Sequence, residues 1–352
     1  MRYRFPPLKP IRRAARAALL GSVFASCLVV GSSANAALSF VFDYSDNGGK
    51  TEFLDPTFGA ARQTALETAG TLFSNYFGSL FSNSATIHLA VEGTDTPLPG
   101  TLAYAGSRAA FDPPFSGGFG NSSVVYNKMM GNGDLNGAAN DGVVGVNWGA
   151  PWELDPNVAV AAQGAGNFDL FAAIFHEFTH ALGFASALNA AGTDGTSQNG
   201  GTEVGGVDYF GFWNKFDQFK TDCGTTDLID HATGKTDPIY ASAKTGQMCF
   251  NGTNAKAANG GAQVALYTPN TYEPGSSGSH LDESGNNVGA MMKFDRNPDV
   301  NEARMYNAIE IGVLMDIGYT RVSANAVPEP TTALLVLGAL GALGLSRRRK
   351  KA

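Results

Sequence analysis

Cysteine and histidine are both scarce in this sequence of 352 residues, which has three cysteines and five histidines. Cys27 lies in an N-terminal segment that we expect to be removed, so Cys223 and Cys249 are left in the body of the chain. Two widely spaced cysteines exclude a disulfide-dense scaffold and do not match the close spacing of zinc-binding cysteines. We therefore expect one disulfide between them, formed in an oxidising compartment, with two separate metal-binding thiols as the alternative.

Basic residues are also few in the body of the chain. Of the 24 Lys and Arg residues, six lie in residues 1–36 and five at the C-terminus, which leaves 13 against 30 Asp and Glu in residues 37–326. The body therefore has a formal net charge near −17. Such a surface repels nucleic acid and anionic lipid, so we expect no nucleic-acid partner.

The N-terminal apolar run, roughly residues 17–30, is short for a membrane span. It follows a basic segment and ends before Ala34-Asn35-Ala36, which has the small-x-small form that signal peptidase cleaves. Residues 1–36 are therefore predicted to be a signal peptide, with signal peptidase as a processing partner. The alternatives are an uncleaved membrane anchor and a lipoprotein modified at Cys27.

A second short apolar run, residues 333–345, lies near the C-terminus between Pro328-Glu329-Pro330 and five basic residues. A short hydrophobic segment with a positive stop is expected to enter a membrane with its basic end in the cytoplasm. The order of these parts resembles the PEP-CTERM sorting tail of Gram-negative bacteria that make exopolysaccharide. The resemblance implies an exosortase that cleaves near Pro328-Glu329-Pro330, so that the linker and tail, residues 321–352, provide only a transient membrane segment. It also implies a final location on the cell surface, in the exopolysaccharide matrix or outside the cell. An ordinary C-terminal anchor is the alternative.

Hydrophobic periodicity predicts several strands and helices in the body. The region over residues 131–149 is rich in Gly, Asn and Asp and is predicted to be a loop. Its oxygen atoms suggest Ca²⁺ as a second cofactor, although their spacing does not match an EF-hand. The expected strands begin at Leu38, Ala85, Thr101 and Ser122, and the expected helices cover residues 59–81, 169–182 and 300–315.

The stretch HEFTHALG, from His176 to Gly183, lies in the second of these helices. Residues in a helix advance by about 100° each, so His176 and His180 point the same way, away from the apolar side of the helix. Two imidazoles at positions i and i+4 can hold one metal ion. Glu177 between them can act as the general base toward a water molecule that a zinc ion activates.

A catalytic zinc ion usually has three protein ligands and one open position, so a third ligand is needed. His280 is the best candidate, because a flexible Gly/Ser stretch precedes it and the residues AMM, ending at Met292, follow it. His88 is expected on the polar face of a strand. The remaining candidates are His231, Asp208 and Glu302.

HEFTHALGF, together with the distant SHLDE and AMM, resembles the metzincin zinc endopeptidases. Their compact form has the third histidine six residues after the second, where this chain has Ser186. His280 lies 100 residues after His180, which resembles the leishmanolysin-type variant with an insertion, here about residues 184–279. Residue by residue, the resemblance implies that His176, His180 and His280 bind Zn²⁺, that Glu177 is the base, that Gly183 permits the turn after the helix, and that Met292 or Met291 forms the methionine turn.

One residue departs from the family pattern. Phe294 stands two residues after Met292, where some metzincins have a tyrosine able to bind zinc or the transition state. Without that hydroxyl, the oxyanion would depend on the zinc ion and on another donor. The chain also has no cysteine-switch motif to hold activity back during export.

These features together predict an exported zinc-dependent endopeptidase with an α+β, zincin-like fold of two lobes over residues 37–320. A protein or peptide substrate would add as a strand to an exposed sheet edge, for which residues 86–91 (TIHLAV) are the candidate. The alternatives are a surface or matrix adhesin that keeps a zincin scaffold without turnover, and a calcium-dependent matrix protein built on the Asn/Asp-rich loops.

Overall fold

The computed structural model describes residues 38–96, 100–110, 118–157, 166–193, 203–204, 207–208, 211–298 and 302–322. Contacts divide the chain into two units, Met1–Asn35 and Ala36–Ala352, and the described residues all belong to the second. The predicted signal peptide and the apolar C-terminal tail lie outside the described residues. None of the helices in the described part combines the length and the apolar character that a membrane crossing requires.

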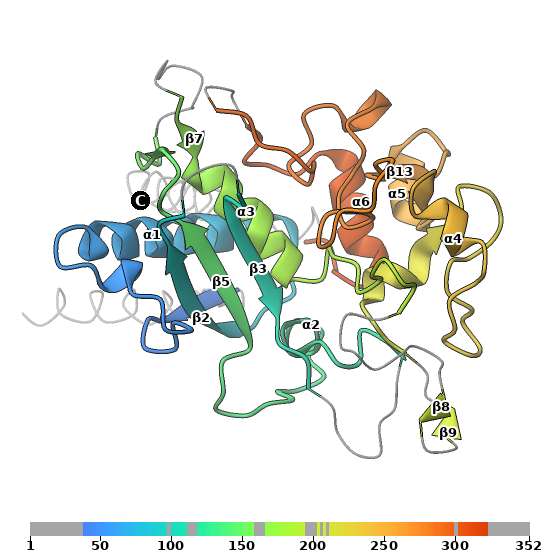
Figure 1. Cartoon of the computed structure of the whole chain (residues 1–352), viewed down its shortest axis with the longest axis horizontal. Helices are drawn as coiled ribbons and strands as arrows, with labels where there is room; N and C mark the ends of the chain where they lie inside the picture. The colour runs from blue at the N-terminus through green and yellow to red at the C-terminus, as the bar shows by residue number, and fades with distance from the viewer. Residues whose placement is uncertain are drawn as a thin grey trace, which may run out of the picture. The chain divides into compact units, whose positions relative to one another are not determined.

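A four-stranded sheet of order β1-β2-β5-β3 lies in the N-terminal half of the described chain (Figure 1). Its first three strands, β1 (Ser39–Asp43), β2 (Thr86–Thr94) and β5 (Gly142–Asn147), are parallel to one another. The fourth strand, β3 (Ala103–Ser107), runs antiparallel to β5 and forms one edge. Because β2 lies between β1 and β5, the prediction that residues 86–91 form an exposed edge is wrong, and β3 takes that place beside the helix of the histidine motif.

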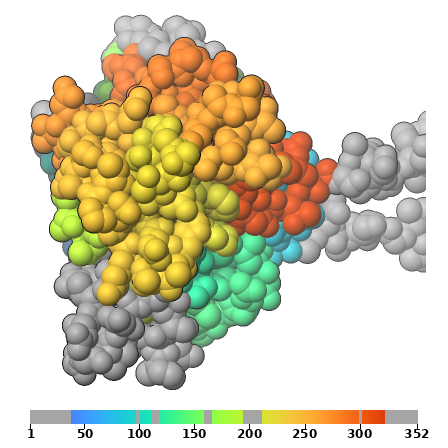
Figure 2. Space-filling view, turned by 90° about the vertical axis from the view of Figure 1, so that its right-hand side faces the viewer, coloured from blue at the N-terminus to red at the C-terminus, as the bar shows by residue number. Residues whose placement is uncertain are grey.

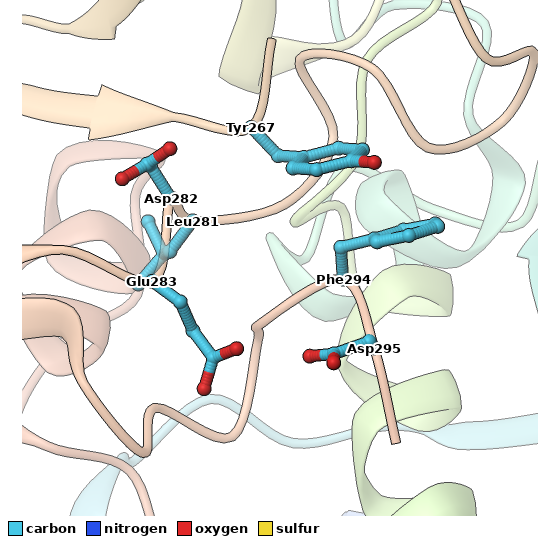
Figure 3. Close-up of a pocket in the computed structure, with 6 residues that line it drawn as sticks. All are labelled: Tyr267, Leu281, Asp282, Glu283, Phe294 and Asp295. Carbon is cyan, nitrogen blue, oxygen red and sulfur yellow. The ribbon is translucent and has the colours of Figure 1, made fainter. Parts of the chain in front are cut away.

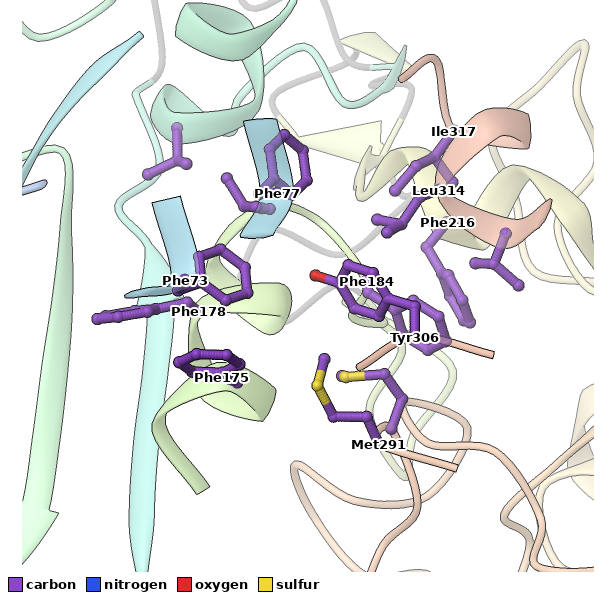
Figure 4. Close-up of a cluster of buried hydrophobic side chains, with 14 of the residues drawn as sticks. Phe73, Phe77, Phe175, Phe178, Phe184, Phe216, Met291, Tyr306, Leu314 and Ile317 are labelled. Atoms are coloured by element: carbon purple, nitrogen blue, oxygen red, sulfur yellow. The ribbon is translucent and has the colours of Figure 1, made fainter. Parts of the chain in front are cut away.

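Two helices contact one face of this sheet through aromatic side chains. They are α1 (Gly59–Leu80) and α3 (Leu170–Ala181), and both agree with the predicted helices. The ring of Phe40 in β1 stacks on Phe178 of α3 at 4.2 Å and contacts Phe73 of α1 at 6.1 Å. Phe73 and Phe178 also meet edge to face (Figure 4). Phe73 and Phe178 are fully buried, and these contacts fix the rotation of α3 so that its opposite side carries the histidine pair.

Two further sequence predictions in this half are wrong. Residues 122–127 were expected to form a strand because Val and Tyr favour strands, but α2 (Val124–Met129) is a short helix. Ser123 caps it by accepting a hydrogen bond from the N–H of Tyr126 at 3.3 Å. The local cap and the burial of Val124 and Val125 therefore override the β propensity.

The second wrong prediction is the long loop over residues 131–149, since its last part forms β5 inside the sheet. Val144 and Val146 are buried on the helix side. On the other side Gly145 leaves room for the ring of Tyr104, because a Cβ at this position would lie 2.2 Å from that ring. Glycine here serves a close contact between strands and does not mark a turn.

The C-terminal half of the described chain consists of short elements and long ordered loops. Residues coloured yellow to orange, which lie between His180 and His280 or shortly after, gather on the face seen in Figure 2. A three-stranded antiparallel sheet of order β11-β12-β13 belongs to this region. The short helices of the C-terminal half are η3 (Lys215–Phe219), α4 (Tyr240–Ala243), α5 (Thr253–Ala258) and η4 (Gly285–Asn287). Its short strands are β8 (Glu203–Val204), β9 (Val207–Asp208), β10 (Phe212–Trp213), β11 (Lys220–Thr221), β12 (Met248–Phe250) and β13 (Val264–Leu266). The N-terminal half also has short elements, namely η1 (Glu52–Leu54), β4 (Gly118–Phe119), β6 (Trp152–Glu153) and β7 (Phe168–Asp169).

The last helix, α6 (Ala308–Asp316), is shorter than the predicted helix over residues 300–315. Asn307 and Glu310 form a capping box, in which each side chain accepts a hydrogen bond from the backbone N–H of the other residue. Because this cap fixes the start of the helix, Ala308 is exposed and Ile309 is buried.

The predicted disulfide between Cys223 and Cys249 is confirmed. Its two cysteines are 26 residues apart, one in β12 and the other in the turn that follows β11. The bond therefore closes a loop inside the segment that separates His180 from His280.

Loss of this bond is expected to lower the free energy of unfolding by about 3 kcal/mol, because a loop of this length gains conformational entropy in the unfolded chain. Urea unfolding of the chain with and without a reductant measures the difference. The Cys223→Ser/Cys249→Ser double variant, which a reductant cannot affect, is the control. Equal midpoints for the oxidised and reduced chain would contradict the prediction.

Candidate metal centre

Helix α3 is held in place at both ends. At its start, Asp169 accepts a hydrogen bond from the N–H of Ala172 at 3.0 Å and forms two hydrogen bonds with the guanidinium of Arg304, at 2.8 and 2.9 Å. At its end, Gly183 has a φ of 107°, a conformation that favours glycine. This turn brings the carbonyl of Phe184 back below the helix.

His176, His180 and His280 converge. Their Nε2 atoms lie 2.9 Å (His176 and His180), 3.1 Å (His176 and His280) and 3.1 Å (His180 and His280) apart. Three ligands of one tetrahedral zinc ion, at about 2.0–2.1 Å from it, lie about 3.3 Å from one another. The observed separations are slightly shorter than this, and they place the three nitrogens within reach of one metal ion. Within the described part of the chain, no other group of three His, Cys, Asp or Glu side chains comes together in this way.

The other nitrogen of each ring, Nδ1, forms a hydrogen bond with a backbone carbonyl. The Nδ1–H of His176 donates to the carbonyl oxygen of Met291 at 2.8 Å, that of His180 to Phe184 at 2.6 Å, and that of His280 to Ser276 at 3.0 Å. A carbonyl oxygen only accepts, so these partners place the proton of each neutral ring on Nδ1. Three unprotonated Nε2 lone pairs therefore face one another, and a bound cation is the partner that satisfies all three.

Burial keeps these rings unprotonated. It lowers the pKa of His176 well below its usual value, that of His180 to about 3 and that of His280 to about 4. The neighbouring imidazoles and the charge of Arg296 act in the same direction on His176. The rings are therefore ready to bind a metal ion at neutral pH without first releasing a proton. His176 and His280 are buried, whereas His180 is partly exposed, so the triad is open to solvent on the side of His180.

Glu177 lies beside the triad. Its Oε1 is 4.0 Å from Nε2 of His176, and its Oε2 accepts a hydrogen bond from the N–H of Ala105 in β3 at 3.1 Å. Burial raises the pKa of Glu177 to about 7, against the opposing influence of Arg296 and of the Ala105 N–H. A carboxyl group with a pKa near neutrality can both accept and return a proton.

Ser186, at the position of the third histidine in the compact family form, takes part in a different network. Its hydroxyl donates to Asp217 at 2.6 Å and accepts from the ammonium of Lys220 at 2.8 Å. Burial lowers the pKa of Lys220 to about 8 and raises that of Asp217. The N–H of Ser186 donates to the hydroxyl of Ser279 at 3.2 Å, so this network also holds the residue before His280. No local pattern in the sequence indicates these contacts, because they join distant segments.

The rival third ligands lie elsewhere. His231 is exposed, with Nε2 at 2.9 Å from the carbonyl of Gln218, and it does not reach the triad. Glu302 is buried and paired with Arg296 and Lys293. Asp208 lies in β9, and its side chain lies outside the described residues.

Met291 and Met292 are both fully buried (Figure 4). The carbonyl of Met291 receives the hydrogen bond of His176, so the segment predicted as the methionine turn contacts the triad through its backbone. Phe294 lies edge-on to His280, with ring centroids 5.9 Å apart, and stacks on Tyr267 at 4.2 Å.

A cavity of about 310 Å³ is lined in part by Leu281, the residue after His280, with the stacked rings of Tyr267 and Phe294 on one side (Figure 3). The carboxylates of Glu283 and Asp295 lie near each other on another side, 3.4 and 3.6 Å from the ammonium of Lys293. Its full lining is Tyr267, Leu281, Asp282, Glu283, Phe294 and Asp295.

Two acidic side chains of the Asn/Asp-rich loop form ion pairs with a lysine. The ammonium of Lys128 lies 3.1 Å from Asp134 and 2.9 Å from Asp141. Calcium binding by this loop stays a prediction.

Comparison with protein families gives one result, and it concerns the tail. Residues 326–350 match the PEP-CTERM protein-sorting motif. The motif indicates export in a Gram-negative bacterium, processing by an exosortase, and a surface or extracellular location. Comparison with curated proteins and with solved structures found no match.

Proposed function

We propose that the body of the chain is a zinc-dependent endopeptidase of the metzincin type, with a zincin-like fold, acting outside the cytoplasm. One observation carries the proposal: three imidazoles of fixed tautomer direct their free nitrogen lone pairs at a common point beside a buried carboxyl group. A purely structural role would not require three unprotonated lone pairs to face one another, because burying them without a partner is costly.

His176, His180 and His280 would hold the zinc ion, and Glu177 would handle the proton. When bound, zinc lowers the pKa of a coordinated water toward neutrality and polarises the carbonyl of the scissile peptide bond. Glu177 takes a proton at its carboxylate and passes it to the departing amine. The hydrogen bond from Ala105 holds the Glu177 carboxylate at the triad during this transfer.

The substrate would lie along β3 as an added strand. The Ala105 N–H in β3 points to Glu177, on the side of the strand away from β5. Backbone N–H and C=O groups of alternate residues in a strand point to the same side, so those of Ala103 and Ser107 also point away from β5. A peptide that pairs with these groups runs past Glu177 and the triad. Main-chain pairing of this kind supplies affinity with little dependence on sequence.

Casein hydrolysis by the chain without its signal peptide tests the proposal. We expect hydrolysis that a zinc chelator stops and that added Zn²⁺ restores. Hydrolysis unaffected by the chelator would exclude the zinc mechanism. Zinc binding without any hydrolysis of casein or of a peptide library would instead favour the non-catalytic surface or matrix adhesin.

A further inference from the structure

Buried side chains form hydrogen bonds with both the carbonyl oxygen and the N–H of the peptide group between Met291 and Met292. Its oxygen accepts hydrogen bonds from Nδ1 of His176, at 2.8 Å, and from Nη2 of Arg296. Its N–H donates to Oε1 of Glu310 at 2.6 Å. A carbonyl oxygen has two lone pairs, so the His176 and Arg296 bonds together use its full acceptor capacity.

Arg296 is itself held in place. Its Nη1 lies 3.3 Å from Glu302, and Glu302 also accepts from the N–H of Asn297 at 3.1 Å and pairs with Lys293 at 3.3 Å. The side chains of Arg296 and Glu302 are 9% and 4% exposed. The planar guanidinium thus bridges a buried carboxylate and the Met291 carbonyl, an arrangement for which arginine is suited and lysine is not.

We propose that Arg296 is a positioning residue for His176, because it holds the carbonyl oxygen that fixes the orientation and tautomer of this metal ligand. The inference rests on the metal site of the proposed function. Arg296 does not touch the metal position in this arrangement, and its hydrogen bond reaches His176 through the Met291 carbonyl. Loss of such outer partners typically weakens metal binding by about 10–100-fold.

The positive charge of Arg296 has the opposite effect on a bound cation, which it repels. Removing the charge together with the hydrogen bond would therefore mix two effects of opposite sign. Arg296→Lys separates them, because it keeps the charge while a single ammonium cannot span Glu302 and the Met291 carbonyl as the guanidinium does.

The chain offers a matched control in Arg304. Its guanidinium also bridges a buried carboxylate, that of Asp169, and a backbone carbonyl, that of Pro156 at 2.6 Å. That carbonyl is not bonded to a metal ligand in the described structure. Arg304→Lys therefore makes the same substitution in a similar ion pair at the start of α3, so it also measures any effect on zinc binding that acts through this helix and not through the methionine turn.

The experiment measures the dissociation constant for Zn²⁺ by competition with a chromophoric chelator, in the wild type and in both variants. We expect the constant to rise by about 10–100-fold in Arg296→Lys and to change less than about threefold in Arg304→Lys. We also expect an altered visible absorption spectrum of the Co²⁺ form in Arg296→Lys only. Circular dichroism of the metal-free chains establishes that each variant is folded.

Equal zinc affinity and equal Co²⁺ spectra for wild type and Arg296→Lys would overturn the inference, as would equal losses in the two variants. If Arg296→Lys does not fold, Glu302→Gln takes its place. This variant keeps the guanidinium but weakens the ion pair that holds it, so it must also lower the affinity for Zn²⁺. A wild type that binds zinc without cleaving casein would contradict the proposed function and leave this inference standing.

Discussion

Replacement of Glu177 by glutamine is expected to lower kcat/KM for peptide hydrolysis by about 10²–10⁴-fold, the contribution typical of a general base. Glutamine has nearly the same shape, and its carbonyl oxygen can still accept the hydrogen bond that Ala105 gives to Glu177. It cannot take up a proton from the attacking water. The loss should therefore appear in kcat, with the fold and the bound metal unchanged.

Initial rates on a fluorogenic peptide and zinc content after dialysis measure these two quantities. Glu67→Gln on the exposed side of α1 changes the net charge by the same amount and is the control. The pKa of Glu177 is about 7 in the metal-free chain, and a nearby cation lowers it. Wild-type activity should therefore fall as the pH drops through a value at or below about 7. Full activity in Glu177→Gln would assign the base to another residue.

Replacement of His280 by alanine is expected to abolish stable zinc binding. It removes one of three converging nitrogens, so affinity should fall by more than the roughly 10–100-fold that loss of an outer-shell partner costs. Hydrolysis should fall to background at the same time. The stabilisation of the chain by zinc, seen as an increase in Tm, should also disappear, because a ligand that no longer binds the folded state cannot stabilise it.

His231→Ala is the matched control for this experiment. His231 is exposed and lies 3.8 Å from Asp227, outside the triad, so its replacement should leave zinc content and Tm unchanged. Zinc content by atomic absorption and thermal melting with and without Zn²⁺ distinguish the variants. Loss of zinc in His231→Ala with retention in His280→Ala would refute the assignment of the third ligand.

The elements with a clear hydrophobic period were predictable from the sequence. α1, α3, β1 and β2 have apolar residues at steps that match their structure, and each lies within a few residues of its predicted range. β5 was not predicted, because its Gly and Asn residues continue the Gly/Asn/Asp-rich pattern that is typical of a loop. Only the ring of Tyr104 across the sheet explains Gly145. The start of α6 was misplaced because the Asn307 cap was not recognised.

The candidate site was predictable to a similar extent. The spacing of His176 and His180 follows from helix geometry alone, and the surroundings of His280 favoured it over the other histidines. The groups that orient the rings were not predictable, since they are backbone carbonyls of Met291, Phe184 and Ser276. A carbonyl has no signature in the sequence. The same holds for Arg296 and for the pairing of Ser186 with Lys220 and Asp217, which depend on distant segments meeting.

His280 lies 100 positions after His180, and this separation bears on when the metal site can form. The intervening segment contains the Cys223–Cys249 bond, which forms only under oxidising conditions. A chain that crosses the inner membrane unfolded would bring its third imidazole into place only after translocation. On the proposed function, zinc would therefore bind only in the periplasm, and peptidase activity would begin only after export.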